Sequence, residues 1–295
     1  MPRLLPSSGS SRDRESRVTS RHPGLGGAAA TSGVPGALRA LGVRPSRRLG
    51  QNFLMDPRVA ERIASLVQEP TETVVEIGPG LGALTGELIA RAGRIVAVEI
   101  DRDLAARLRE RFAPDQLELV VGDALAFDFT LLGRGLRVVG NLPYNISSPL
   151  LFHLAAQVDA LRDLTVMLQR EVVARMTAAP ATAEYGRLTV MLQATFAIER
   201  LFVVPSGAFQ PAPKVESAVA RLVPLGEKRP RIADPARFER VVAAAFSQRR
   251  KTLRNALAAI VAPAAFTAAG IDPQRRGETL SVREFVALAD AAPAP

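Results

Sequence analysis

The stretch VVGNLPYNISSPL, residues 138–150, places an amide, a proline and a tyrosine where an apolar strand is expected to end. These residue types suit a reaction at the exocyclic amine of adenine, whose lone pair is delocalised into the ring. The side-chain oxygen of Asn141 and a nearby backbone carbonyl can accept both amine hydrogens, which turns the lone pair toward an electrophile. Pro143 fixes the backbone so that the carbonyl of Leu142 stays aimed inward, and Tyr144 offers a face on which an extruded base can stack. The alternative is a plain turn with a surface tyrosine.

A glycine-rich turn lies earlier in the chain, in VVEIGPGLGALT, residues 74–85. Gly78 and Gly80 let the backbone approach a ligand, and the following helix offers free N–H groups. Glu99 ends the next strand, where a carboxylate can bind ribose hydroxyls. Asp123 ends the third strand and either accepts from an adenine amino group or caps a helix. By themselves these residues fit a nicotinamide dinucleotide as well as S-adenosylmethionine.

The elements that must position these residues alternate between strands and helices. Apolar strands are expected at 73–77, 95–100, 117–123, 137–141 and 164–168, and helical stretches at 81–93, 103–112, from about 147, and at 171–176. This alternation predicts an α/β fold with a parallel, doubly wound, Rossmann-like sheet. The last two strands, 197–204 and 217–225, have no helix between them, which predicts an antiparallel hairpin at the end of the sheet.

The C-terminal part of the chain changes character. One continuous helix is predicted over residues 236–261, ended by Pro263, and another near Val282–Ala289. We therefore expect a small all-helical domain over 226–295 after a catalytic domain over 47–225.

Charge and composition narrow the classes of function. The net charge of +9 divides into +7 over residues 1–48, −3 over 49–225 and +5 over 226–295, which suits a catalytic body with a basic module. Residues 1–46 are rich in Arg, Ser, Gly and Pro and are predicted to be a disordered extension, with a transit peptide as the alternative. The chain lacks cysteine, which excludes disulfides and thiol nucleophiles and fits a reducing compartment, the cytoplasm.

Taken together, the motifs resemble the small-subunit rRNA adenine N6,N6-dimethyltransferases. The resemblance runs from about Arg47 to Ala289 and is carried by GQNFL (50–54), EIGPGLGALT (76–85), VEIDRD (98–103), GDAL (122–125), NLPYNISSPLL (141–151), FQPAPKVESAV (209–219) and FSQRRKTLRNAL (246–257). The large-subunit rRNA adenine methyltransferases of macrolide resistance share the glycine loop and an Asn-x-Pro-Tyr motif. The last three of these runs favour the small-subunit family.

The resemblance implies S-adenosylmethionine as the cofactor, with Gly78 against its amino-acid end, Glu99 on the ribose and Asp123 on the adenine. The full implied cofactor-binding set is Asn52, Leu54, Gly78, Gly80, Glu99, Asp123 and Asn141, of which the first two fold over the cofactor. The implied catalytic set is Asn141, Leu142, Pro143, Tyr144 and Phe209, the last as a second stacking aromatic opposite Tyr144. No metal is needed, because a sulfonium is already a strong electrophile.

On the substrate side, the basic residues Arg249, Arg250, Lys251 and Arg254 suit a phosphate backbone, although a solvated charged face would look the same. The resemblance implies two adjacent adenines in a hairpin loop near the 3′ end of small-subunit rRNA, reached within a pre-ribosomal particle by a monomeric enzyme. The competing hypotheses are a methyltransferase for large-subunit rRNA or DNA, a non-catalytic ribosome-assembly factor, and a nicotinamide-dependent oxidoreductase.

Overall fold

The computed structural model describes residues 38, 42–46, 48–67 and 73–292. The predicted disordered extension over 1–46 lies largely outside these residues. Within the described part of the chain, no helix is both long and apolar enough to cross a bilayer.

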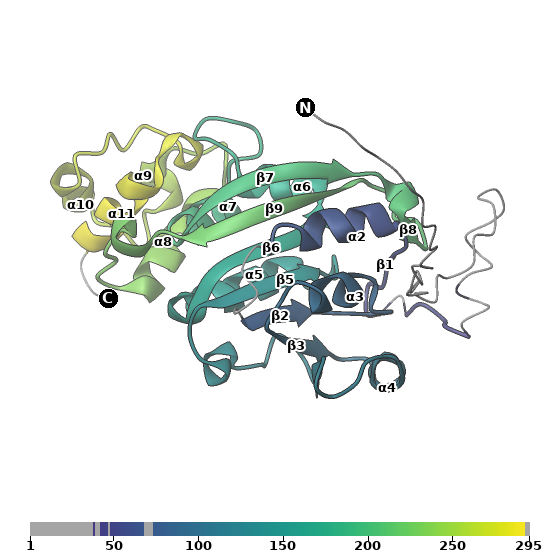
Figure 1. Ribbon diagram of the computed structural model, residues 1–295. Helices are drawn as coiled ribbons and strands as arrows, with labels where there is room; N and C mark the ends of the chain where they lie inside the picture. The colour runs from purple at the N-terminus through teal and green to yellow at the C-terminus, as the bar shows by residue number, and fades with distance from the viewer. Residues whose placement is uncertain (1–37, 39–41, 47, 68–72, 293–295) are drawn as a thin grey trace, which may run out of the picture. The chain divides into compact units, whose positions relative to one another are not determined.

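A seven-stranded mixed sheet forms the centre of the fold (Figure 1). Its strands are β2 (Thr73–Ile77), β3 (Arg94–Glu99), β4 (Glu118–Val121), β5 (Leu136–Asn141), β6 (Leu161–Gln169), β7 (Phe196–Val204) and β9 (Ser217–Pro224), in the spatial order β4-β3-β2-β5-β6-β9-β7. The first five strands run parallel, and β9 pairs antiparallel with both β6 and β7. The predicted α/β class and the terminal hairpin are confirmed.

Both faces of the sheet are covered because successive side chains of a strand point to opposite sides. Val75 and Val138 pack into one core with helices α5 (Ser147–Ala156), α6 (Arg170–Met176) and α7 (Arg187–Gln193). Their neighbours Val74 and Val139 pack into a second core with helices α2 (Pro57–Ala64), α3 (Ala83–Ile89) and α4 (Arg102–Arg111). Central strands buried on both sides explain the nearly continuous apolar runs in the sequence.

A second, two-stranded sheet joins β1 (Phe53–Leu54) to β8 (Phe209–Gln210) in antiparallel fashion. The pairing was not predicted, because each strand is only two residues long and carries no periodicity. It attaches the segment before the first long strand to the loop before β9.

The C-terminal helices are α8 (Pro235–Ser247), α9 (Leu253–Ala256), α10 (Pro263–Ala268) and α11 (Val282–Ala291) (Figure 1). The predicted helix near 282–289 is confirmed, and it begins with a reciprocal capping box between Ser281 and Glu284. The prediction of one helix over 236–261 is wrong, because residues 248–250 form a turn. The backbone N–H of Leu253 donates to the carbonyl of Arg275 (2.7 Å), a tertiary bond that redirects the chain.

The buried core of these helices includes side chains from the segment before α8. Tyr185 and Val190 pack with Phe238, Leu253 and Phe285. The hydroxyl of Tyr185 donates to the carbonyl of Leu280 at 2.7 Å. Helices α8–α11 therefore share their core with α7, which lies inside the predicted catalytic domain.

A buried ion cluster ties three neighbouring strands together. Asp163 on β6 lies 3.3 Å from the guanidinium of Arg137 on β5, and its other carboxylate oxygen lies 2.6 Å from Arg221 on β9. Arg137 also donates to the carbonyl of Leu66 (2.7 Å). Asp163 and Arg137 are both buried, so removal of the carboxylate charge upsets the balance of charge in a poorly solvating interior.

We predict that Asp163→Asn lowers the free energy of unfolding by roughly 3 kcal/mol, the usual cost of breaking a buried ion pair from one side. Urea denaturation followed by circular dichroism measures it. The matched control is Glu118→Gln, which removes an exposed pair with Arg94 and should cost less than about 1 kcal/mol. Equal losses for the two variants would contradict the structural role of the cluster.

Candidate active site

The register of the parallel strands brings three of the predicted residues to one edge of the sheet. Ile77 on β2 pairs with Val98 on β3, and Glu76 pairs with Val139 on β5. Gly78 and Glu99 directly follow the first pair, and Gly78 and Asn141 both lie two residues beyond the second pair, so Gly78 lies between Glu99 and Asn141. Ligands of such sheets bind outside the carboxyl ends of the strands, at this edge.

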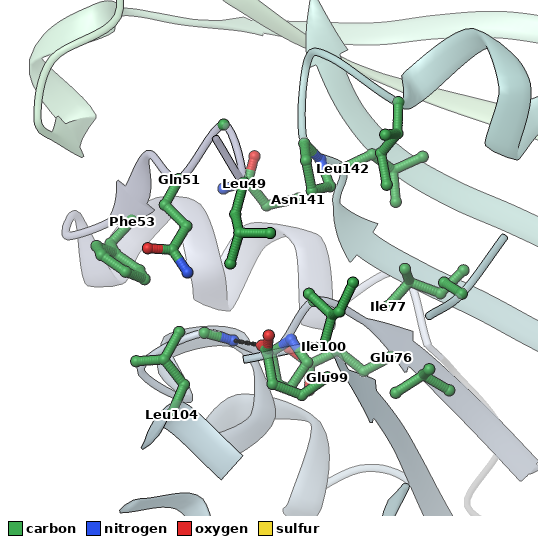
Figure 2. Close-up of a pocket in the computed structure, with 18 of the residues that line it drawn as sticks. Leu49, Gln51, Phe53, Glu76, Ile77, Glu99, Ile100, Leu104, Asn141 and Leu142 are labelled. Atoms are coloured by element: carbon green, nitrogen blue, oxygen red, sulfur yellow. Dashed lines mark hydrogen bonds between the residues drawn. The ribbon is translucent and has the colours of Figure 1, made fainter. Parts of the chain in front are cut away.

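A cavity opens at this edge, and Figure 2 shows it between the strand ends and a covering segment, residues 49–54. Leu49, Gln51 and Phe53 of the covering segment lie across the cavity from Glu99 and Ile100 (Figure 2). The predicted residues that line the cavity are Asn52, Leu54, Gly78, Gly80, Glu99, Asp123, Asn141, Leu142, Pro143 and Tyr144. The structure thus brings together all the implied cofactor-binding residues.

The glycine turn needs its glycines for conformation and for space. Gly78 and Gly80 have φ angles of 67° and 58°, in the left-handed region that L side chains rarely adopt. A Cβ on Gly80 would lie 3.2 Å from the ring of Phe53 in the covering segment. On β5, a Cβ on Gly140 would lie 2.6 Å from the carbonyl oxygen of Ile77. Only glycine at 140 lets β5 lie this close to β2 beside the cavity.

Glu99 is held by backbone donors. The N–H of Gly80 donates to one carboxylate oxygen (3.0 Å) and the N–H of Asp101 to the other (2.9 Å). The side chain is 4% exposed, and burial raises its pKa although both backbone bonds oppose the rise. Each oxygen keeps a further lone pair that can accept from a ligand hydroxyl. This arrangement fits the predicted contact with a ribose.

Glu76 lines the same cavity and was missed by the sequence analysis. It is 1% exposed and accepts a 2.6 Å hydrogen bond from the hydroxyl of Thr85. Burial raises its pKa to about 7; the Thr85 bond opposes this rise and the charge of Glu99 adds to it. The signal in the sequence is a carboxylate inside the otherwise apolar strand TVVEI, where an acid is rarely placed without a partner.

Asp123 lies at the cavity and also closes a local turn, so the predicted contact with an adenine stays a prediction. Its side chain accepts from the N–H of Leu125 at 2.9 Å, as a turn-capping aspartate does, and it also lines the cavity. Ile100, a second residue that sequence analysis missed, follows Glu99 and is 48% exposed at the cavity. It provides an apolar surface suited to the face of a planar ring.

Asn141 is oriented by the covering segment. Its Nδ2 donates to the backbone carbonyl of Asn52 at 2.8 Å, which commits the amide nitrogen to the protein and directs Oδ1 to a ligand. Nearby, Nδ2 of Asn145 donates to the carbonyl of Arg48 (3.1 Å), and Gln51 donates to Asp101 (2.9 Å). Three amide side chains therefore fasten the covering segment over the cavity.

The two predicted stacking rings have different environments. Tyr144 is partly exposed at the cavity, and its hydroxyl lies 2.7 Å from Oγ of Ser217. Phe209 is 1% exposed and packs with Val204 and Val219 in the core beneath β1, and it is not among the described residues that line the cavity. The expectation that Phe209 stands opposite Tyr144 as a stacking ring stays a prediction, and in this structure the ring is buried.

Three of the four basic residues, Arg249, Arg250 and Lys251, lie on the link between α8 and α9, and Arg254 lies on α9. Arg249 donates to the backbone carbonyls of Ala183 (3.0 Å) and Tyr185 (3.1 Å) and lies 3.5 Å from Glu278, so it fastens this link to the preceding segment. The remaining three, Arg250, Lys251 and Arg254, are exposed. The sequence pattern did not distinguish Arg249, which bonds to backbone carbonyls of the protein, from the other three basic residues.

We predict that Glu76→Gln changes the pH dependence of stability. Because the folded-state pKa of Glu76, about 7, lies above the ordinary value of 4.5 for a glutamate, the folded protein holds a proton that the unfolded chain releases, and stability falls as pH rises between these two values. Glutamine can still accept from Thr85 but cannot ionise. The thermal midpoint of the variant should match that of the wild type near pH 5 and should be higher near pH 8. The corresponding gain in the free energy of unfolding at pH 8 is up to about 3 kcal/mol. Melting curves of the ligand-free protein across this range measure it; a constant difference would contradict the prediction.

Comparison with known proteins identifies the family of the chain. The family profile described as ribosomal RNA adenine dimethylase matches residues 43–292. The ribosomal RNA small subunit methyltransferase A of Aromatoleum aromaticum is 58% identical over 246 residues, covering 83% of this chain and 93% of that protein. Among solved structures, a dimethyladenosine transferase from Plasmodium falciparum shares the fold, with a TM-score of 0.68 at 24% identity over 80% of this chain and 95% of that one. The 23S rRNA methyltransferase ErmE has a TM-score of 0.63 at 30% identity over 81% and 99%. The chain belongs to the ribosomal RNA adenine dimethylase family of S-adenosylmethionine-dependent methyltransferases.

Proposed function

We propose that this protein transfers methyl groups from S-adenosylmethionine to N6 of two adjacent adenines in a hairpin loop near the 3′ end of small-subunit rRNA. The observation that carries the proposal is the oriented amide of Asn141, which lies in one cavity with the glycine turn and Glu99. Identity of 58% to a small-subunit enzyme, against 30% to a 23S rRNA enzyme, supports the choice of the small subunit.

The cavity residues fit the cofactor chemically. S-adenosylmethionine supplies an electrophilic methyl group on a positively charged sulfur. Glu99, whose oxygens are aimed by Gly80 and Asp101, would bind the ribose hydroxyls, and Asp123 would accept from the adenine amine. Gly78 leaves open backbone beside the carbonyl of Asn141 for the amino-acid end. The buried acids Glu76 and Glu99 favour a cationic ligand, since a nearby positive charge lowers their raised pKa values.

Catalysis would rest on positioning. Oδ1 of Asn141 and the carbonyl of Leu142 accept the two amine hydrogens and hold the nitrogen with its lone pair toward the methyl group. Both oxygens also stabilise the positive charge that develops on the nitrogen, and the proton then leaves to water. After one transfer the amine has a single hydrogen, so the second transfer uses one of the two acceptors. Tyr144 would stack on the extruded base.

The RNA would lie across the exposed basic residues Arg250, Lys251 and Arg254 of the helical module, residues 226–295. Their charges suit phosphates, whereas Arg249 is engaged by backbone carbonyls of the protein. We place the reaction in the cytoplasm, on a pre-ribosomal small subunit, with the protein acting as a monomer.

The paired substitution Arg250→Ala with Lys251→Ala should weaken binding to small ribosomal subunits without changing the melting temperature. The slope of log affinity against log salt should fall by about 1 to 2, because up to two phosphate contacts are lost. Filter binding at several KCl concentrations measures this. Arg249→Ala is the contrasting variant and should lower the melting temperature, because it removes two bonds to carbonyls. An unchanged salt slope in the paired variant would show that the RNA binds another surface of the protein.

The function is tested with purified protein, methyl-labelled S-adenosylmethionine and small ribosomal subunits that lack the modification, followed by nucleotide mapping. Dimethyladenine at two neighbouring positions near the 3′ end is expected. Label found only on 23S rRNA or on DNA would contradict the assignment of small-subunit rRNA as the substrate. Binding to small subunits without methyl transfer would favour the hypothesis of a ribosome-assembly factor. Asn141→Ala should fold normally and lose transfer about 100-fold or more, the scale for one transition-state hydrogen-bonding group. Full activity of Asn141→Ala would contradict the proposal that Asn141 binds the target amine.

A further inference from the structure

We propose that Ser217 is a positioning residue that aims the ring of Tyr144 at the target base. This inference rests on the proposed function. The two side chains are 73 positions apart in the sequence, yet their hydroxyl oxygens lie 2.7 Å from each other. Ser217 is 0% exposed, whereas Tyr144 is partly exposed and is one of the residues that line the cavity.

The anchor is fixed independently of the loop that carries the tyrosine. Ser217 is the first residue of β9, where its Cα pairs with Gln169 on β6 and with Val204 on β7. The preceding residue, Glu216, accepts from the backbone N–H of Arg170 (2.9 Å) and forms a 2.6 Å ion pair with its side chain. Ser217 is therefore held by the antiparallel end of the sheet.

The tyrosine is held at both of its ends. Its backbone carbonyl accepts from the hydroxyl of Ser147 at 3.2 Å, and its phenol oxygen meets Ser217. The phenol oxygen lies on the long axis of the ring, so this bond fixes χ1 and thereby the direction of the ring from the backbone. Burial raises the pKa of Tyr144, so the phenol stays protonated and the bond persists at neutral pH.

A stacking ring gains most when its direction from the backbone is set before the base arrives, since ordering a side chain on binding costs free energy. Without Ser217 the ring can leave the cavity by rotation about χ1. The base would then be held loosely, and small misplacement of a reacting atom has a large effect on rate. Ser217 is not among the described residues that line the cofactor cavity, so cofactor binding should be unaffected.

Kinetics on small ribosomal subunits test the proposal. Ser217→Ala should lower kcat roughly tenfold and leave the KM for S-adenosylmethionine unchanged. Tyr144→Phe keeps the ring but removes the hydroxyl, so it should give a similar loss, and the double variant should lose no more than either single one. A kcat within twofold of wild type in Ser217→Ala, or losses that multiply in the double variant, would overturn the proposal. If Ser217→Ala does not fold, Tyr144→Phe alone carries the test by the same twofold criterion.

A spectroscopic measurement separates this proposal from the activity itself. The chain has two tyrosines and no tryptophan, so Tyr185→Phe leaves Tyr144 as the sole phenol. In that background Ser217→Ala should lower the tyrosine fluorescence anisotropy, because the ring becomes mobile. Ser65→Ala, an exposed serine on the end of α2, is the matched control and should leave it unchanged. Unchanged anisotropy in Ser217→Ala would overturn the positioning role even if the protein methylates rRNA, and lowered anisotropy would support it even if the substrate assignment failed.

Discussion

The parallel pairing of β2 with β3 on one side and with β5 on the other is the constraint on which the site depends. It places Gly78 between Glu99 and Asn141 without any direct bond among their side chains. Gly140 permits the close approach of β5 to β2, since a Cβ there would meet the carbonyl of Ile77. A one-residue slip would turn Val74 and Val75 to the wrong cores, so the packing on both faces enforces the register.

Electrostatics in the cavity follow from that packing. Two carboxyl groups, Glu76 and Glu99, are buried near each other at the ends of adjacent strands, which destabilises their ionised forms. A cationic cofactor would stabilise the ionised forms of both groups, and this stabilisation would contribute to the free energy of cofactor binding. Asn141 donates to the carbonyl of Asn52 in the covering segment, Gln51 of that segment donates to Asp101, and Asn145 donates to the adjoining Arg48. In the proposed mechanism, the amide of Asn141 would link closure of the covering segment to the orientation of the oxygen that accepts from the substrate amine.

The proposed substrate side consists of elements outside the parallel strands. Ser217 on β9 contacts the hydroxyl of Tyr144, and the α8–α9 link with α9 carries the exposed basic residues. The C-terminal helices share a core with Tyr185 and Val190. Arg249 fastens the α8–α9 link to the carbonyl of Tyr185. The position of the basic residues therefore depends on contacts that the catalytic half of the chain supplies.

The succession of strands and helices, the terminal hairpin and the residues at the strand ends could be predicted from the amino-acid sequence, because they follow from local periodicity and from glycine, proline and amide residues at defined points. The break after Ser247, the burial of Phe209, the raised pKa of Glu76 and the orientation of Asn141 became visible in the folded chain. Each of these depends on a partner remote in the chain, such as Asn52, which is 89 positions from Asn141. Local pattern encodes which face of an element is apolar, whereas hydrogen bonds between distant loops are set only when packing brings the loops together.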